Sequence, residues 1–244
     1  MTNFALLETI LYTPTQGFYL LDLHIRRLLR SAAEFHRRNP SLFTTIPSPD
    51  AIREFLQENV PNDDTFKRVR LLLDEKLHVE YTVLDPSAAR APDTLVDVIA
   101  QEPTLKVVLD SQPLACSTTD PFLRNKTTQR DAYNEARQRA GCGTEKGPFD
   151  VILWNKDRQV TESSIANIAI QSLGENGQHV WRTPSVECGL LPGVFREALL
   201  ASGEVVEDII TVDELMQAQK DGQPIVCFNS VRKLYRVQVM DASE

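Results

Sequence analysis

Lys126 is the side chain whose type and setting suggest covalent chemistry. It stands in the stretch Phe122-Leu-Arg-Asn-Lys-Thr-Thr-Gln-Arg-Asp-Ala-Tyr133, directly after Asp120-Pro121. The proline disfavours helical backbone at Asp120, and Thr127 or Thr128 is of the type that caps a helix. We therefore predict an extended segment up to Lys126 and a helix after it. An amine at such a junction suits a Schiff base with a cofactor aldehyde, although a single lysine is more often a solvated surface residue.

Glu162 is a second candidate, in the stretch Thr161-Glu-Ser-Ser-Ile-Ala-Asn167. It precedes a strand that we expect to be buried, and a buried carboxylate needs a cationic or protonated partner. A pyridinium nitrogen is one such partner. The ordinary alternative is a glutamate of a surface loop.

Three further positions could hold a phosphate. Gly193 precedes a predicted helix, so the backbone N–H groups of Val194 and Phe195 would face an anion. Arg27 offers a guanidinium fork, and Ser230 offers a hydroxyl at the end of a predicted strand. Each position also has an ordinary interpretation, which is a turn or a solvated helix face.

Together these residue types are the ones that pyridoxal phosphate requires. A lysine binds its aldehyde, a carboxylate keeps the ring nitrogen protonated, and an arginine, a hydroxyl and backbone N–H groups hold its phosphate. The residues alone leave this as one of several options.

The elements expected in the N-terminal half form an α+β domain. Apolar patterns predict a strand at residues 4–12, a turn at 13–17, a second strand at 18–21, a helix capped by Asp22 that runs to about Arg38, and a short helix from Pro49. A β-hairpin is expected over residues 66–84 and a strand at 105–109. We expect this domain to cover residues 1–109, with a linker at 110–120.

The C-terminal half, residues 121–244, is expected to be a second domain that carries Lys126. Strands are predicted at 149–154, 165–170, 179–181, 205–210, 225–228 and 234–239, and helices at 194–201 and 211–220. Thr211 and Glu214 form a capping box at the start of the last helix. The fold class is therefore α+β or α/β with two domains.

Composition excludes several other classes of protein. The chain has 244 residues and a net charge of −8, which argues against a nucleic-acid or membrane partner. The four cysteines and four histidines have no metal-ligand spacing, so we expect no metal site. The N-terminus has no signal-peptide pattern, and a cytoplasmic location is expected.

The chain resembles the fold-type IV pyridoxal-phosphate enzymes, the class IV aminotransferase family, and within it the aminodeoxychorismate lyase branch. The resemblance covers nearly the whole chain. It rests on five stretches in the family's order: residues 20–33, 122–133, 151–167, 183–196 and 229–232. It implies a two-domain fold of the D-amino-acid aminotransferase type, with pyridoxal 5'-phosphate between the domains, and a homodimer.

The resemblance also implies roles for individual residues. Lys126 matches the Schiff-base lysine, Glu162 the partner of the ring nitrogen, and Arg27 the phosphate arginine. The remaining cofactor contacts are expected at Asn167, Val194, Phe195 and Ser230. Arg130, Tyr133, Asn229 and Arg232 are candidates for substrate contacts. Phe195 departs from the family, in which many members carry threonine at this position.

Three functions are compatible with this interpretation. The first is a lyase that converts 4-amino-4-deoxychorismate into 4-aminobenzoate, a folate precursor, and pyruvate. The second is a class IV transaminase for a D-amino acid, a branched-chain amino acid or an amine. The third is a non-catalytic descendant, against which the presence of Lys126 and Glu162 argues.

Overall fold

The computed structural model describes residues 4–86, 92–103, 105–174 and 177–240. The chain divides into two compact units, which we call unit 1 and unit 2. Unit 1 holds the described residues up to 86 together with Asn125–Gln129 and Ser230–Arg232. Unit 2 holds the described residues of 92–124, all of Arg130–Asn229 except 175–176, and residues 233–240.

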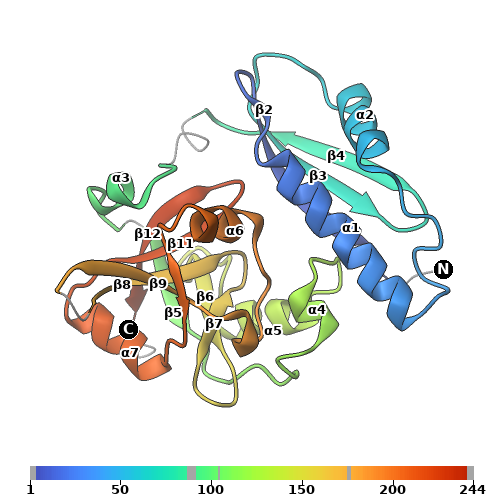
Figure 1. Cartoon of the computed structure of the whole chain (residues 1–244). Coiled ribbons are helices and arrows are strands. Elements are labelled where there is room, and N and C mark those ends of the chain that lie inside the picture. The colour runs from blue at the N-terminus through green and yellow to red at the C-terminus, as the bar shows by residue number, and fades with distance from the viewer. Residues whose placement is uncertain (1–3, 87–91, 104, 175–176, 241–244) are drawn as a thin grey trace. The chain divides into compact units, whose positions relative to one another are not determined.

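Unit 1 is a four-stranded antiparallel sheet with two helices. The strand order is β2-β1-β3-β4. The elements are β1 (Leu6–Thr13), β2 (Gly17–Phe18), α1 (Leu21–Arg38), α2 (Pro49–Asn59), β3 (Lys67–Leu73) and β4 (Leu77–Val83). α1 packs against β1, and α2 packs against β4 and α1. Figure 1 shows α1 running along the sheet.

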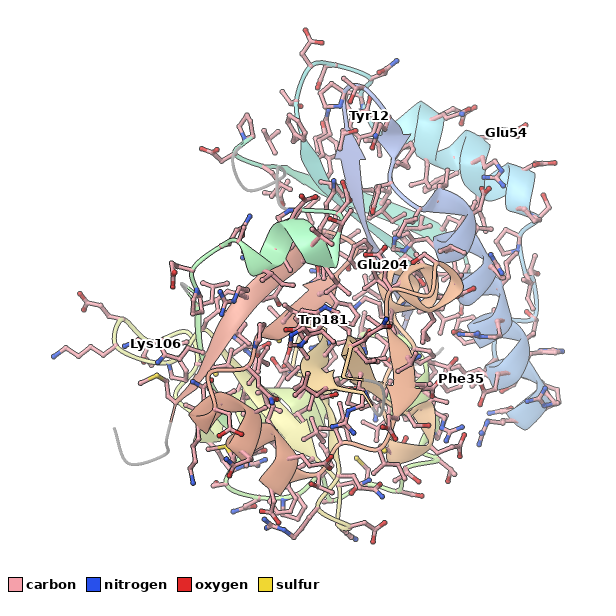
Figure 2. The ribbon with its side chains drawn as sticks, turned by 60° about the vertical axis from the view of Figure 1, so that its left-hand side comes forward. Tyr12, Phe35, Glu54, Lys106, Trp181 and Glu204 are labelled. Atoms are coloured by element: carbon pink, nitrogen blue, oxygen red, sulfur yellow. The ribbon has the colours of Figure 1, made fainter. Side chains whose placement is uncertain are left out.

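Alternation and helical periodicity explain these elements. In β3, Val69, Leu71 and Leu73 are buried, while the residues between them are more exposed. α1 buries an apolar stripe that ends at Phe35, seen on α1 in Figure 2. The Phe35 ring centroid lies 4.9 Å from that of Phe4, within an aromatic cluster that fixes this end of the helix.

The start of α1 differs from the prediction. The expected strand at 18–21 is wrong, since β2 contains only Gly17–Phe18, paired with the last two residues of β1. Asp22 does not cap α1. The N-cap is Leu20, whose backbone is left-handed at φ 52° and which forms no side-chain cap bond. Asp22 lies in the first turn instead, where its negative charge interacts favourably with the helix dipole.

Unit 2 is built on an eight-stranded sheet with the order β10-β9-β8-β11-β12-β5-β6-β7. Its strands are β5 (Leu105–Leu109), β6 (Asp150–Trp154), β7 (Val160–Ser163), β8 (Asn167–Leu173), β9 (His179–Pro184), β10 (Val206–Asp208), β11 (Ile225–Asn229) and β12 (Lys233–Met240). The helical segments are α3 (Leu95–Ile99), α4 (Pro121–Arg124), α5 (Asp131–Arg139), η1 (Val186–Cys188), α6 (Val194–Ala201) and α7 (Val212–Lys220). Among the described residues, no helix is long and apolar enough to cross a membrane.

Hydrophobic clusters hold the helices of unit 2 against its sheet, and two of them lie at α7 and α5. The larger one lies where α7 packs against β8 and β12, and includes Ile168, Leu215 and Val237. The smaller one joins α5 to β6 through Tyr133, Ala136 and other side chains. The expected helix at 211–220 is confirmed, with both hydrogen bonds of its capping box in place.

The expected domain boundaries do not match the two units. β5 (Leu105–Leu109) pairs in parallel with β12 and with β6, so it belongs to the sheet of unit 2. Residues 110–120 consequently lie inside unit 2 and do not link the two units. Lys126 was expected in the C-terminal domain but belongs to unit 1. Local sequence patterns predict strands well, but they do not identify the strand's partners.

Candidate functional site

Lys126 lies in an extended segment that pairs with β1. Its carbonyl oxygen accepts a hydrogen bond from Leu7 N at 2.9 Å, and Thr127 forms an antiparallel bridge with Leu6. These bonds fix the backbone on both sides of the lysine. The lysine is therefore anchored by the strand and not by a helix start.

Neither threonine after Lys126 caps the following helix, which corrects the prediction. Thr127 Oγ1 donates to Gln129 O at 3.1 Å, and Thr128 Oγ1 accepts from Ala5 N at 2.9 Å. α5 begins at Asp131, and its N-cap Arg130 forms no side-chain cap bond. The stretch before the lysine also contains the short helix α4, where an extended segment was expected. The Thr127 hydroxyl is used within its own turn and the Thr128 hydroxyl by the residue before β1, so neither is available for capping.

Glu8 is the centre of a buried charged cluster in unit 1. Its side chain projects from β1 toward α1, where Arg27 Nε donates to Oε1 at 2.9 Å and Arg27 Nη2 donates to Oε2 at 2.5 Å. His24, one helical turn before Arg27, places Nδ1 2.6 Å from Oε2. All three residues are at most 4% exposed. Arg27 thus carries its charge in a fixed orientation.

The charges in this cluster shift the pKa values of its members. Burial raises the pKa of Glu8, but the Arg27 charge and the hydrogen bonds from His24 and Arg27 outweigh it and lower that pKa to about 2. The pKa of His24 is lowered by burial and by the charges of Arg27 and Lys126, against the attraction of Glu8. With Nδ1 donating to Glu8, His24 Nε2 is an acceptor, and in the described part of the chain it has no hydrogen-bond partner.

Sequence reasoning missed Glu8 and His24 as site residues. The available signals were the single charged residue in the expected strand at 4–12 and the i, i+3 spacing of His24 and Arg27 on a helix.

Glu162 is the centre of a second buried cluster, in unit 2. It lies in β7 and is 4% exposed. Its Oε1 accepts from Tyr133 OH at 2.8 Å and from Leu191 N at 2.9 Å, and its Oε2 accepts from Asn167 Nδ2 at 3.4 Å. Asn167 Nδ2 also donates to Leu191 O at 2.9 Å. The carboxylate is therefore held by β8, α5 and the segment before α6.

Tyr133 and Arg130 are part of this arrangement. The Arg130 guanidinium lies 4.7 Å from the centroid of the Tyr133 ring, and its Nη2 donates to Ser164 O at 2.5 Å. Burial and the adjacent Glu162 raise the pKa of Tyr133 well above its ordinary value. The substrate contacts expected of both residues stay a prediction.

The Gly193 turn brings α6 close to Asn167. Gly193 is the N-cap of α6 and has no side-chain cap bond. A Cβ at this position would collide with Asn167 Oδ1, so a larger residue here would have to displace that side-chain amide. The Phe195 ring is buried and packs on Phe228, with 6.2 Å between ring centroids. Phenylalanine in place of the family's threonine therefore serves the core, and anion binding here would fall to backbone N–H groups such as that of Val194.

The turn between β11 and β12 carries the remaining predicted residues. Ser230 Oγ donates to Thr9 O at 3.1 Å in unit 1, and Asn229 Nδ2 donates to Ile165 O at 3.1 Å in unit 2. Arg232 is exposed.

The predicted residues fall into two groups. Those in unit 1 are Lys126, Arg27, Ser230 and Arg232. Those in unit 2 are Glu162, Asn167, Val194, Phe195, Arg130, Tyr133 and Asn229.

Both groups fit pyridoxal phosphate by the chemistry of their donors. Unit 1 supplies an amine on a rigid backbone and an oriented guanidinium. Unit 2 supplies a buried, oriented carboxylate and, at Gly193, a helix start without a side-chain cap. These are the contacts that an aldehyde, a phosphate and a ring nitrogen require.

Comparisons with known proteins agree with this chemistry. Residues 5–239 match the sequence model of the family described as amino-transferase class IV. A protein of Schizosaccharomyces pombe named "Putative aminodeoxychorismate lyase" is 34% identical over 238 residues, which are 96% of this chain and 89% of that protein. The aminodeoxychorismate lyase of Saccharomyces cerevisiae is 32% identical over 135 residues, which are 51% of this chain and 34% of that protein.

The fold agrees as well. A crystal structure from Mesorhizobium loti, titled "Putative amino-acid aminotransferase", has a TM-score of 0.75 and 26% identity, and covers 98% of this chain and 100% of that one. The expected two-domain fold class is thereby confirmed. The chain belongs to the class IV aminotransferase family of pyridoxal-phosphate-dependent enzymes.

Proposed function

We propose that the chain is a pyridoxal-phosphate-dependent 4-amino-4-deoxychorismate lyase, which releases 4-aminobenzoate and pyruvate. The observation that carries this proposal is the likeness to the S. pombe protein, which runs along 96% of the chain. The name of the S. cerevisiae relative supports the same substrate. The buried Glu162 and the anchored Lys126 support an active cofactor site.

Each predicted cofactor residue has a task that its surroundings support. When bound, pyridoxal phosphate supplies an aldehyde that captures the amine and a ring that accepts electrons. Lys126 Nζ would attach the cofactor, and the same amine would carry the proton of the amine-bearing carbon. In unit 1 the Arg27 guanidinium and the Ser230 hydroxyl would bind the phosphate, and in unit 2 the N–H groups of Val194 and Phe195 are the candidate phosphate donors. Glu162 would hold a proton at the ring nitrogen, and Asn167 donates a hydrogen bond that orients Glu162.

A transaminase is the second candidate. It is favoured by the M. loti structure, whose title names an amino-acid aminotransferase and which spans the whole of this fold. The same Lys126 and Glu162 would serve, and the two reactions differ in whether a keto-acid acceptor is needed.

The decisive experiment supplies aminodeoxychorismate to the purified protein without any keto acid. We expect 4-aminobenzoate and pyruvate in equal amounts. Lys126→Ala should abolish both products and the visible absorption band of the bound cofactor. Lys156→Ala, which changes an exposed lysine of unit 2, is the matched control and should change neither.

Two outcomes would contradict the proposal. Turnover that appears only after a keto acid is added would establish the transaminase. A protein that cannot be loaded with pyridoxal phosphate would exclude both reactions.

A further inference from the structure

Packing of the hydrophobic core does not by itself explain why residue 133 carries a hydroxyl group. α5 buries Tyr133 and Ala136 against a small apolar cluster that includes Leu123 and Leu153. A phenylalanine would fill this space equally well. The phenol oxygen instead reaches Glu162 Oε1 at 2.8 Å, across 29 residues of sequence.

The hydrogen bonds at Glu162 distinguish its two oxygens. Oε1 accepts two strong bonds, from Tyr133 OH at 2.8 Å and Leu191 N at 2.9 Å. The bond from Asn167 Nδ2 to Oε2 is longer, at 3.4 Å. A carboxylate oxygen has two lone pairs, so Oε1 is saturated. A further donor would therefore meet Oε2.

We propose that Tyr133 is a positioning residue that presents Glu162 Oε2 to the ring nitrogen of the cofactor and keeps the shared proton on that nitrogen. The inference rests on the proposed use of pyridoxal phosphate. Each donor to a carboxylate stabilises its negative charge and lowers its affinity for a proton. The Tyr133 O–H bond stays intact, and only the position of the proton between Oε2 and the ring nitrogen changes.

The surroundings keep this donor in its neutral form. Burial and the Glu162 charge raise the pKa of Tyr133, so the phenol stays protonated at neutral and mildly alkaline pH. Arg130 faces the ring from the start of α5, with an opposite but weaker influence. Arg196 of α6 is within electrostatic reach of Glu162 and adds to the stabilisation of its negative charge. Among these groups, the Tyr133 hydroxyl can be removed without changing any formal charge.

The test compares Tyr133→Phe with the wild type, both loaded with pyridoxal phosphate labelled with ¹⁵N in its ring. We expect the ring nitrogen signal of the wild type at the position of a protonated pyridine, and that of Tyr133→Phe displaced toward the unprotonated position. We also expect kcat to fall about tenfold, the effect of one hydrogen bond to a charged group, with KM little changed.

Tyr235→Phe is the matched control. Tyr235 is a second buried tyrosine of unit 2, in β12, and its ring packs on Phe149. Its substitution should leave the nitrogen signal and kcat unchanged. If Tyr133→Phe fails to fold, a fluorinated tyrosine at position 133 provides a test of opposite sign. Its more acidic hydroxyl donates more strongly and should move the nitrogen signal further toward the protonated position.

The outcomes separate this inference from the proposed function. A wild-type protein that does not bind the cofactor would overturn the proposed function. A wild type that binds it, with a nitrogen signal that Tyr133→Phe leaves unchanged, would overturn the inference alone. An equal loss of kcat in Tyr133→Phe and Tyr235→Phe would also overturn it, because that would reflect packing.

Discussion

Two glutamates, one in each unit, are almost completely buried and are held in different ways. Glu8 in unit 1 contacts the Arg27 guanidinium and the His24 ring directly. Glu162 in unit 2 accepts hydrogen bonds from a phenol, a backbone amide and a side-chain amide. Their exposure is 1% and 4%, so burial does not distinguish them. They differ in whether these hydrogen-bond donors are charged.

The difference indicates different roles. At Glu8 the Arg27 guanidinium contacts the carboxylate directly. This contact keeps Glu8 ionised and fixes the orientation of Arg27. At Glu162 the phenol, the backbone amide and the side-chain amide fix its orientation and are themselves neutral. Glu8 is therefore expected to matter first for stability, and Glu162 first for catalysis.

The largest effect is expected from Glu8→Gln. It leaves the Arg27 charge buried without its partner, and removing one member of a buried pair costs about 3–5 kcal/mol of unfolding free energy. Urea denaturation of the unloaded protein measures this loss. Glu80→Gln removes the partner of Arg70 in an exposed pair of the same sheet and should cost less than about 1 kcal/mol. Equal losses in the two variants would refute the role given to Glu8.

Glu162→Gln should show the reverse pattern. We expect the loaded enzyme to lose roughly 100-fold in kcat, as when an oriented electrostatic group is removed from an active site. The unfolding free energy of the unloaded protein should fall by only about 1 kcal/mol, because neutral donors are rearranged. Glu135→Gln, an exposed change on α5, is the control. A stability loss as large as that of Glu8→Gln would remove the contrast between the two clusters.

Acid should destabilise unit 1 through the cluster of Glu8, His24 and Arg27. The pKa of Glu8 is about 2 in the folded chain, against an ordinary value of 4.5. Its stabilising contribution is therefore complete above pH 4.5 and is lost as the pH falls toward 2, by up to about 1.4 kcal/mol per pH unit. The lowered pKa of His24 acts in the same direction, since the unfolded chain takes up a proton below 6.5. The stability difference between wild type and Glu8→Gln should shrink below pH 4.5 in denaturation curves, and a constant difference would contradict the assigned pKa.

Gly193→Ala, a change next to the Glu162 cluster, should have the smallest effect on the unfolding free energy. The added Cβ collides with Asn167 Oδ1 and displaces the amide that holds Glu162 and Leu191 O. We expect a loss of about 1 kcal/mol in unfolding free energy, typical of mild overpacking. The same change in an Asn167→Ala background should cost little, because the colliding atom is gone. A penalty that persists in that background would place the clash elsewhere.

Features set by neighbouring residues could be predicted from the sequence. The capping box of Thr211 and Glu214 and the apolar stripe of α1 follow local rules, and both are present. The start of α1 was mispredicted because the β1–β2 pairing ends at Phe18. The strand at 105–109 was correct as a strand but was placed in the wrong half, since its partners β6 and β12 are remote in sequence.

The candidate site shows the same limit. Residue types and order indicated Lys126 and Glu162, and the family that they implied is confirmed. The pairings that orient these residues join positions far apart in sequence: Glu8 with Arg27 across 19 residues and Tyr133 with Glu162 across 29. No local pattern specifies such contacts, because they depend on how strands and helices pack.

Unit 1 is built from segments that are far apart in the sequence, which has a consequence for when it can fold during synthesis. β1 is synthesised before its partners: it pairs with residues 126–128, and its Thr9 accepts a hydrogen bond from Ser230, 221 positions later. Closing so long a loop is slow and comes late in folding. We therefore expect unit 1 to stay incomplete until residues 230–232 have been synthesised, so that a chain truncated before them would not present an assembled Lys126 segment.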